Sequence, residues 1–232
     1  MREPERGGAD AGVRVGRMAD AAALGRFAAG AAAAGRAVVV GALVVDDAGR
    51  IYVQRRSLQR ALFPGCWDIV GGHVEAGEAP LDALAREVRE ETGWELAALG
   101  PVVEVIDWSG GDGVMRREVD LLARVSGDLS RPRLEPGKHD EGRWLTPSEV
   151  HVLLEGRDPT DRWVHDVVER GFALLKGWLT YAAGPASDRP AASPTPCRPP
   201  PRPPVPAGVT SGRATSAPHP SVARPAEDLG QG

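Results

Sequence analysis

The chain has 232 residues, of which 42% are hydrophobic, so it is long enough to bury one substantial core. Its formal net charge is only −4, and no long basic stretch crosses its middle, which argues against a protein that binds duplex nucleic acid. Of its two cysteines, Cys66 and Cys197, the second lies in a proline-rich segment. We therefore expect no structural disulfide and a reducing, cytoplasmic location.

Both ends of the chain differ in composition from its middle. Residues 1–35 are rich in Ala, Gly and Arg without a sustained apolar period, so we expect a flexible extension in which Met18 is an alternative start to Met1. Glycines interrupt its alanine-rich run, which therefore predicts no membrane span. Residues 183–232 are rich in Pro, Ala and Ser, which favours a disordered tail. The alternative is that its PxxP-like segments are ligands for a polyproline-binding protein. These boundaries leave residues 36–182 as the folded domain.

The first half of this domain shows one strand pattern and one helix pattern. Apolar, largely β-branched runs at 38–45 and 51–53 flank a turn of Asp, Ala and Gly, and together they predict a hairpin. A helix is predicted over residues 79–92, because its apolar residues recur at helical spacing. Pro80 suits the first turn of this helix, and Gly93 supplies a stop signal.

The second half continues the alternation of strands and helices. Residues 102–106 and 119–125 predict two further strands, which a glycine-rich turn separates. Thr146 is a suitable cap for a short helix over 146–154, and a longer helix with one apolar stripe is predicted over 159–182. The expected fold class is therefore α/β or α+β, with a mixed β-sheet flanked by α-helices in a sandwich.

The most specific pattern in the sequence combines glycines, acidic residues and one arginine at fixed spacing. With ordinary residue frequencies, all nine constraints would occur together by chance in far fewer than about one chain in a million. The nine positions are Gly72, Glu78, Arg86, Glu87, Val88, Glu90, Glu91, Gly93 and Trp94.

The three later glutamates of this pattern predict a metal site. Glu87, Glu90 and Glu91 are three and four residues apart, so a helix would gather their carboxylates on one face. The carboxylates repel one another unless a cation lies among them. Mg²⁺ and Mn²⁺ prefer oxygen ligands and bridge protein carboxylates to substrate phosphates. A solvated helical face with Arg86 paired to Glu90 is the alternative, but it does not explain the glycine and glutamate upstream.

With this pattern the chain resembles the Nudix hydrolase family, whose signature all nine positions match. The resemblance covers residues 36–182 and implies a Nudix fold. It also implies a hydrolase, or pyrophosphatase, that uses Mg²⁺ or Mn²⁺ to cleave a diphosphate linkage in a nucleoside diphosphate-X substrate. The residues that it implies as metal ligands are the Gly72 carbonyl, Glu87, Glu90 and Glu91, with Glu90 and Glu91 also in catalytic roles.

The family resemblance and residue chemistry assign roles to the remaining candidates. The family uses the arginine at the place of Arg86 to hold the loop by pairing with the glutamate at the place of Glu78. Glu141 is an outside candidate for the proton acceptor, and a simple surface charge is the alternative. Arg55 and Arg56 end a predicted strand, and they are candidates for substrate binding because guanidinium groups match phosphate oxygens. The alternative is that both are solvated charges at the end of the strand.

The choice of substrate is less specific in the sequence. No segment typical of family members that act on NADH, ADP-ribose or diadenosine compounds is present, which favours nucleoside triphosphates. One alternative is a non-catalytic Nudix module that binds a nucleotide, although such modules usually lose a signature carboxylate. Another is isopentenyl diphosphate isomerase, which Trp67 and the Gly72-His73 pair faintly resemble. That isomerase has a cysteine where this chain has Gly71.

Overall fold

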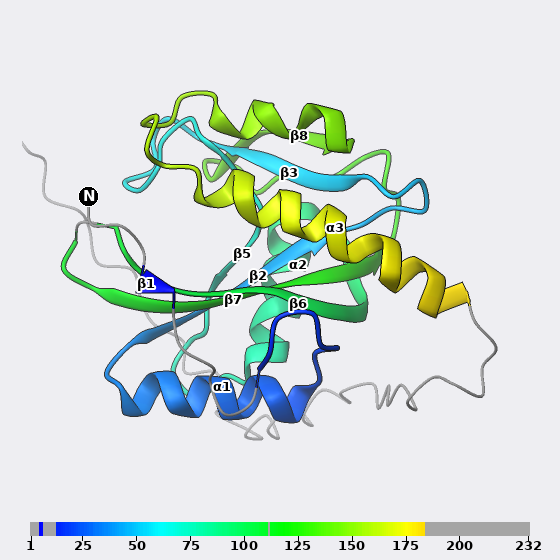
Figure 1. Cartoon of the computed structure of the whole chain (residues 1–232). Helices are drawn as coiled ribbons and strands as arrows, with labels where there is room; N and C mark the ends of the chain where they lie inside the picture. The colour runs from blue at the N-terminus through cyan, green and yellow to red at the C-terminus, as the bar shows by residue number, and fades with distance from the viewer. Residues whose placement is uncertain (1–4, 7–12, 111, 184–232) are drawn as a thin grey trace, which may run out of the picture. The chain divides into compact units, whose positions relative to one another are not determined.

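The computed structural model of the chain describes residues 5–6, 13–110 and 112–183 (Figure 1). The chain divides into two units, 1–189 and 190–232. The disordered tail expected from the sequence therefore lies outside the described residues, apart from its first position. Within the described ranges, no helix has the length and apolar character needed to cross a membrane.

Helices and strands alternate along the described chain. In chain order they are β1 (Glu5–Arg6), α1 (Ala21–Ala33), β2 (Ala37–Val44), β3 (Ile51–Arg56), β4 (Trp67–Asp68), β5 (Val70–His73), α2 (Pro80–Thr92), β6 (Glu95–Ser109), β7 (Met115–Ser126), β8 (His139–Leu145), the 3-10 helix η1 (Pro147–Leu154) and α3 (Trp163–Ala183).

The strands form two sheets. The larger sheet has the order β1-β6-β7-β2-β5, and it is mixed because β2 runs parallel to β7 while its other pairs are antiparallel. The smaller sheet has the antiparallel order β4-β3-β8. The predicted hairpin of β2 and β3 is therefore wrong, since the two strands share only the bridge between Val45 and Ile51. Both edges of β2 are already paired with β5 and β7, which leaves no edge for β3.

Helices cover both faces of the larger sheet, in agreement with the predicted sandwich. In Figure 1, α1 lies below the sheet, while α3 lies above it together with the smaller sheet. One core cluster includes Leu24 of α1, Leu84 and Val88 of α2 and the facing side chains of β2 and β7. A second cluster joins Phe172 of α3 to η1, the smaller sheet and the opposite face of the larger sheet. The two clusters hold the strands between them.

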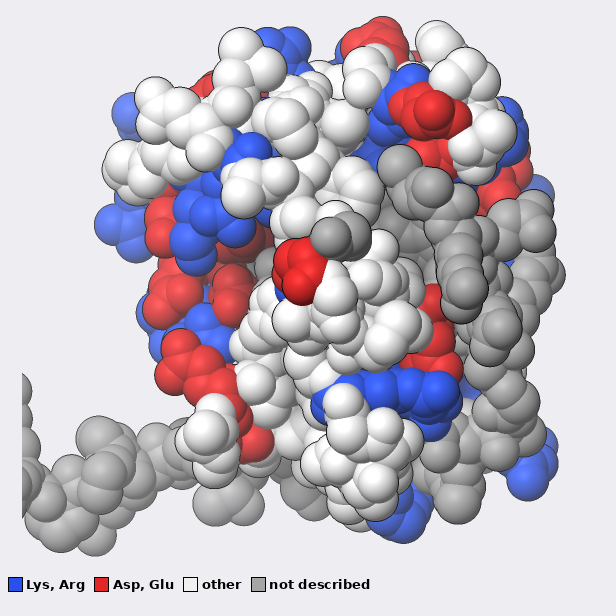
Figure 2. Space-filling view, turned by 90° about the vertical axis from the view of Figure 1, so that its left-hand side faces the viewer, with Lys and Arg blue, Asp and Glu red and all other residues white. Residues whose placement is uncertain are grey.

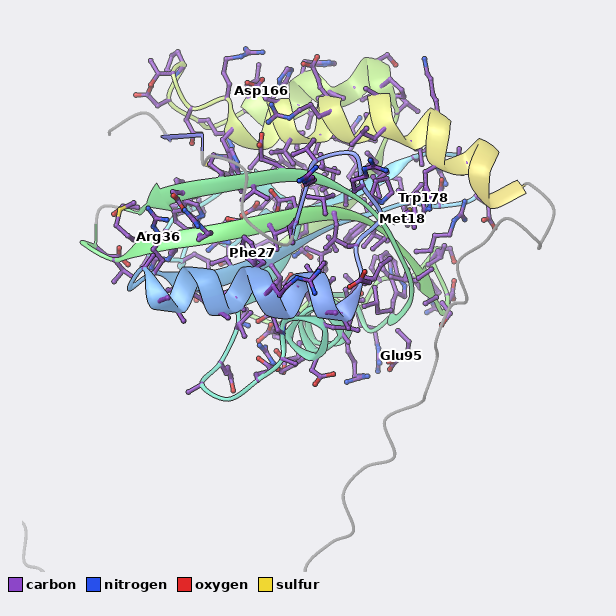
Figure 3. All side chains as sticks on the ribbon, turned by 60° about the horizontal axis from the view of Figure 1, so that its bottom comes forward. Met18, Phe27, Arg36, Glu95, Asp166 and Trp178 are labelled. Carbon is purple, nitrogen blue, oxygen red and sulfur yellow. The ribbon has the colours of Figure 1, made fainter. Side chains whose placement is uncertain are left out.

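Helix α1 lies within the segment that was expected to be a flexible extension, so that expectation is wrong for Ala21–Ala33. The Asp20 side chain caps the helix by accepting a hydrogen bond of 2.7 Å from the backbone N–H of Ala23. Leu24 and Phe27 are fully buried, and Figure 3 shows Phe27 pointing from the helix toward the sheet. Two large apolar residues among small ones give a weak periodic signal, but they suffice to anchor the helix.

Helix α2 has the bounds that its start and stop signals predict. Pro80 stands at the first helical position, and Gly93 ends the helix at a φ of 72°, a left-handed conformation that favours glycine. Its apolar face, with Leu84 and Val88, is fully buried against the sheet. The adjoining part of the same face carries the buried Glu87 and Glu91, and α2 also packs against the strand β5.

Candidate active site

A cavity of about 400 Å³ opens beside α2. It is lined by one end of the larger sheet, by the signature helix and by the loops that follow β3 and η1. Polar residues around it include Arg56, Arg60, Asp68, His73, Glu75, Arg86, Glu87, Glu90, Glu91, Glu118, Lys138, Arg157 and Asp161. Its apolar lining is formed by Val39, Leu62, Phe63, Ile69, Ile106, Trp108 and Trp163. This combination of an apolar part with converging polar groups is typical of small-molecule sites.

The three signature glutamates of α2 all line this cavity, but they differ in burial. The Glu87 and Glu91 residues are only 6% and 4% exposed, whereas the Glu90 side chain is 44% exposed. Their spacing of three and four residues places them on the same helical face, as the sequence predicts. Two buried carboxylates beside one half-exposed carboxylate therefore face the same space.

Glu91 is held by donors from outside its own helix. Its Oε2 accepts hydrogen bonds from Gln54 Nε2 at 2.6 Å and from the backbone N–H of Gly71 at 3.1 Å. Its Oε1 lies 3.8 Å from His139 Nε2. Burial raises the pKa of Glu91 to about 8, and the nearby charge of Glu87 adds to this rise. A cation in the cavity would favour the charged form instead.

Arg86 links the signature loop to the signature helix. Its guanidinium donates two hydrogen bonds to the Glu78 carboxylate, at 2.9 and 3.0 Å, and one of 3.0 Å to the carbonyl of His73. The same group donates to Glu87 at 2.7 Å and to Glu90 at 3.2 Å. The hydrogen bond from Arg86 holds the pKa of Glu78 below its ordinary value. This arginine thus neutralises part of the acidic face while it holds the loop in place.

Gly72 stands where the Glu87 side chain leaves no room for a β-carbon. A β-carbon at Gly72 would overlap the Glu87 carboxylate, because the β5 backbone passes directly against that side chain. A left-handed backbone conformation is not the reason for this glycine, since the positive φ angles belong to other glycines. A side chain at Gly72 would therefore displace the Glu87 carboxylate from its observed position.

The donor set around Glu87 fits a hard divalent cation. It consists of carboxylate and backbone oxygens, which Mg²⁺ and Mn²⁺ prefer. Glu87 and Glu91 are buried carboxyl groups, and the guanidinium of Arg86 contacts the first of them. Buried charges of one sign need compensation, which a divalent ion would supply.

A second group of ligand-type side chains lies on α3. His165, Asp166 and Glu169 place one ligand atom each within 4.8 Å of one another, the one such group of three among the described residues. Arg162 contacts both His165 at 3.2 Å and Asp166 at 3.7 Å, so a cationic side chain already belongs to this group. None of the three lines the cavity, and Figure 3 shows Asp166 on the opposite side of the sheet from α1.

The cations around the cavity differ from those expected. Arg56 lines it, but its guanidinium also donates to the carbonyl of Leu62 at 2.9 Å. Arg55 does not line the cavity. Alternate residues of a strand point to opposite faces, and Arg55 instead lies 3.5 Å from Glu141, with both side chains about half exposed, at 43% and 52%. Neither Arg55 nor Glu141 is therefore brought to the cavity.

Arg60 and Lys138 line the cavity in addition to Arg56. Burial, together with these three cations, lowers the pKa of His139 to about 3, so the imidazole is neutral at physiological pH. Lys138 pairs with Glu135 at 2.7 Å, whereas Arg60 makes no ion pair with any residue that the structure describes. A positive region therefore lies next to Glu91, on the side of the smaller sheet.

Aromatic side chains form the other end of the cavity. The rings of Phe63 and Trp108 have centroids 6.2 Å apart and are tilted by 57°. The indole N–H of Trp108 donates a hydrogen bond of 2.6 Å to Glu118, which is buried next to Asp120 on β7. Burial and neighbouring acidic groups hold the pKa values of both carboxyls above their ordinary values. Trp67, by contrast, is a core residue and does not line the cavity.

A family model described as the NUDIX domain matches residues 35–167, which is more than half of the chain. The chain belongs to the Nudix family. The matched range contains every residue that lines the cavity, including the three signature glutamates. The cavity is therefore part of the Nudix domain itself.

The relatives of this Nudix protein carry different names. A Nudix hydrolase of Deinococcus radiodurans is 30% identical over 138 residues, which cover 58% of this chain and 78% of the relative. An isopentenyl-diphosphate Delta-isomerase of Mycolicibacterium vanbaalenii is 40% identical over 99 residues, covering 40% and 55%. A nucleoside triphosphatase NudI of Escherichia coli O139:H28 is 36% identical over 71 residues, covering 31% and 48%. The chain spans from about a third to two thirds of the length of the first curated relatives that it matches.

The Nudix cavity also contains residues that the sequence did not single out. Arg60 and Phe63 lie in a loop without periodic pattern, and Lys138 stands alone before β8. Glu118 directly precedes the strand predicted over residues 119–125, so the strand pattern gave no signal for it. His73 also lines the cavity, and its Nε2 accepts a hydrogen bond of 2.9 Å from Arg116.

Proposed function

We propose that this Nudix hydrolase uses Mg²⁺ or Mn²⁺ to cleave a diphosphate linkage in a nucleoside diphosphate-X substrate, with nucleoside triphosphates favoured. The observation that carries the proposal is the composition of one cavity. Glu87, Glu90 and Glu91 line it together with Arg60, and the aromatic side chains of Phe63 and Trp108 line it as well. A nucleotide offers matching groups, with a charged phosphate chain and an aromatic base whose face can stack on aromatic side chains.

The acidic face would hold the metal. Glu87, Glu91 and the Gly72 carbonyl are the proposed ligands, with Glu90 as a contributor. When bound, the ion supplies charge neutralisation and Lewis acidity at the reacting phosphate. The half-exposed Glu90 is the proposed proton acceptor for the attacking water, since its carboxylate is open to the cavity. Arg86 keeps its place in the loop through Glu78.

The cations near Glu91 would bind the phosphate chain. Arg60 is the strongest candidate, because its guanidinium is not committed to an ion pair within the described part of the chain. Arg56 would contribute charge while its hydrogen bonds to Leu62 and Asp68 hold the neighbouring loop. Arg55 is better explained by its surface pair with Glu141.

The apolar end supports a ring-containing substrate. Phe63 and Trp108 offer aromatic surface, and Glu118 places a hydrogen-bonding carboxyl between them and the sheet. The name of the E. coli relative, a nucleoside triphosphatase, agrees with this preference. On the face shown in Figure 2, Lys and Arg side chains lie among Asp and Glu side chains, so this face presents no continuous basic surface to a nucleic acid duplex.

Two alternatives make different demands on the same site. The isomerase named among the relatives is the first, but Gly71 stands where that class has its cysteine. Cys66 is a free, buried thiol outside the cavity lining, which also agrees with the reducing cytoplasm that we propose as the compartment. A non-catalytic nucleotide-binding module is the second, and the retention of all the signature carboxylates argues against it.

A substrate panel tests this function. Phosphate or nucleotide release would be measured from nucleoside triphosphates, ADP-ribose, dinucleotides, diadenosine polyphosphates and isopentenyl diphosphate, with Mg²⁺, Mn²⁺ or a chelator. We expect chelator-sensitive hydrolysis that is fastest for a nucleoside triphosphate. Isomerised isopentenyl diphosphate without hydrolysis would support the isomerase, and nucleotide binding without turnover would support the binding module.

A further inference from the structure

Gln54 is a fully buried polar residue on β3, in the smaller sheet. Its Nε2 donates a hydrogen bond of 2.6 Å to Oε2 of Glu91, which belongs to α2 and lies 37 positions further along the chain. An amide nitrogen only donates hydrogen bonds, so in this contact Gln54 is the donor and Glu91 the acceptor. The contact therefore fixes the orientation of both side chains.

The two oxygens of Glu91 have different surroundings. Oε2 accepts a second hydrogen bond from the backbone of Gly71 at 3.1 Å, so two protein donors occupy this oxygen. The nearest cationic or imidazole nitrogen to Oε1 is Nε2 of His139, at 3.8 Å, which is longer than a hydrogen bond. Oε1 is therefore the oxygen that remains open to a ligand.

Core packing does not account for a glutamine at this position. The Gln54 Oε1 atom is buried and has no hydrogen-bond partner among the described residues. A buried acceptor without a partner disfavours folding, so the oxygen of the amide gives no reason for a glutamine there. What the amide adds is the donor toward Glu91.

We propose that Gln54 is a positioning residue that occupies Oε2 of Glu91 and thereby leaves Oε1 as the oxygen that would help to hold a divalent ion. This inference rests on the proposed function, because it takes Glu91 as a metal ligand. Groups that hold a metal ligand in place usually change metal affinity by about 10- to 100-fold when they are removed. Gln54 acts through Glu91 and reaches it from a different sheet.

The test is Mn²⁺ binding in the absence of substrate, measured from the electron paramagnetic resonance signal of the free ion. Gln54→Met keeps the length of the side chain and removes the donor, and we expect it to weaken Mn²⁺ binding by about 10- to 100-fold. Gln59→Met is the matched control, since Gln59 is exposed in the following loop and does not line the cavity. It should bind Mn²⁺ as the unmodified protein does.

Further variants separate the ways in which the inference could fail. Unchanged Mn²⁺ affinity in Gln54→Met, alongside lost affinity in Glu91→Gln, would overturn the role of Gln54 and leave the metal site intact. Unchanged affinity in Glu91→Gln would instead contradict the proposed function. Should Gln54→Met not fold, Gln54→Asn keeps a polar amide that is too short to reach Glu91, and the same loss of affinity is expected.

Discussion

Individual side chains decide which charges face the cavity. Arg55 and Arg56 are neighbours on β3, yet only Arg56 lines the cavity, because alternate side chains of a strand leave on opposite faces. Arg60 follows in the loop and reaches the same cavity. The guanidinium groups that meet a substrate are therefore set by the strand direction and by the path of the loop.

Replacing Arg60 tests its proposed role in binding the phosphate chain of the substrate. We expect Arg60→Gln to lower kcat/KM by about 10- to 100-fold, since a hydrogen bond to a charged group contributes about 1.5–3 kcal/mol. Arg55→Gln is the matched control and should change kcat/KM by less than about threefold, because an exposed ion pair contributes little. Steady-state kinetics with the best substrate of the panel would measure both. Equal losses in the two variants would contradict the assignment of Arg60.

At the scale of elements, α1 is part of the folded domain. Phe27 is fully buried against the larger sheet, so Phe27→Ala should lower the free energy of unfolding by about 3–5 kcal/mol. Arg26→Ala, at the exposed neighbouring position, should change it by less than about 0.5 kcal/mol. Urea unfolding followed by tryptophan fluorescence measures both. Equal stability of Phe27→Ala and the unmodified protein would show that α1 adds nothing to the domain.

Strand β7 buries acidic groups, and this predicts a pH-dependent stability. Burial raises the folded-state pKa of Glu118, so the folded protein holds a proton that the unfolded chain releases above about pH 4.3. Stability should therefore fall as the pH rises from about 5 to 8, by at most about 1.4 kcal/mol per pH unit for this group. Glu118→Gln should have a shallower slope than the unmodified protein in chelator. Identical slopes would show that Glu118 binds no extra proton on folding.

The sequence predicts elements best where several local signals agree. Helix α2 has a proline at its start, a glycine at its end and an apolar stripe between them, and its bounds follow directly. Strand β8 was missed, because His139–Leu145 is mostly polar and belongs to a small sheet. The contact between Gln54 and Glu91 has no local signal at all, since it depends on how two sheets and a helix meet.

At the scale of the domain, the fold brings distant segments of the chain to one cavity. The signature supplies the acidic face, the loop after β3 supplies Arg60 and Phe63, β6 and β7 supply Trp108 and Glu118, and the segment before β8 supplies Lys138. The signature alone identified the acidic face, because all of its residues lie within 23 consecutive positions, from Gly72 to Trp94. The substrate-facing side required the tertiary structure.

The most direct test compares Glu91→Gln with Glu141→Gln in a hydrolysis assay with Mg²⁺. Both variants exchange one carboxylate for an amide, but Glu91 is buried in the cavity, whereas Glu141 is paired with Arg55 on the surface. We predict that Glu91→Gln loses more than about 100-fold in kcat while it remains folded, because a metal ion contributes several kcal/mol to the reaction. Glu141→Gln should keep the kcat of the unmodified protein. Full activity in Glu91→Gln would contradict the assignment of the acidic face as the metal-binding site.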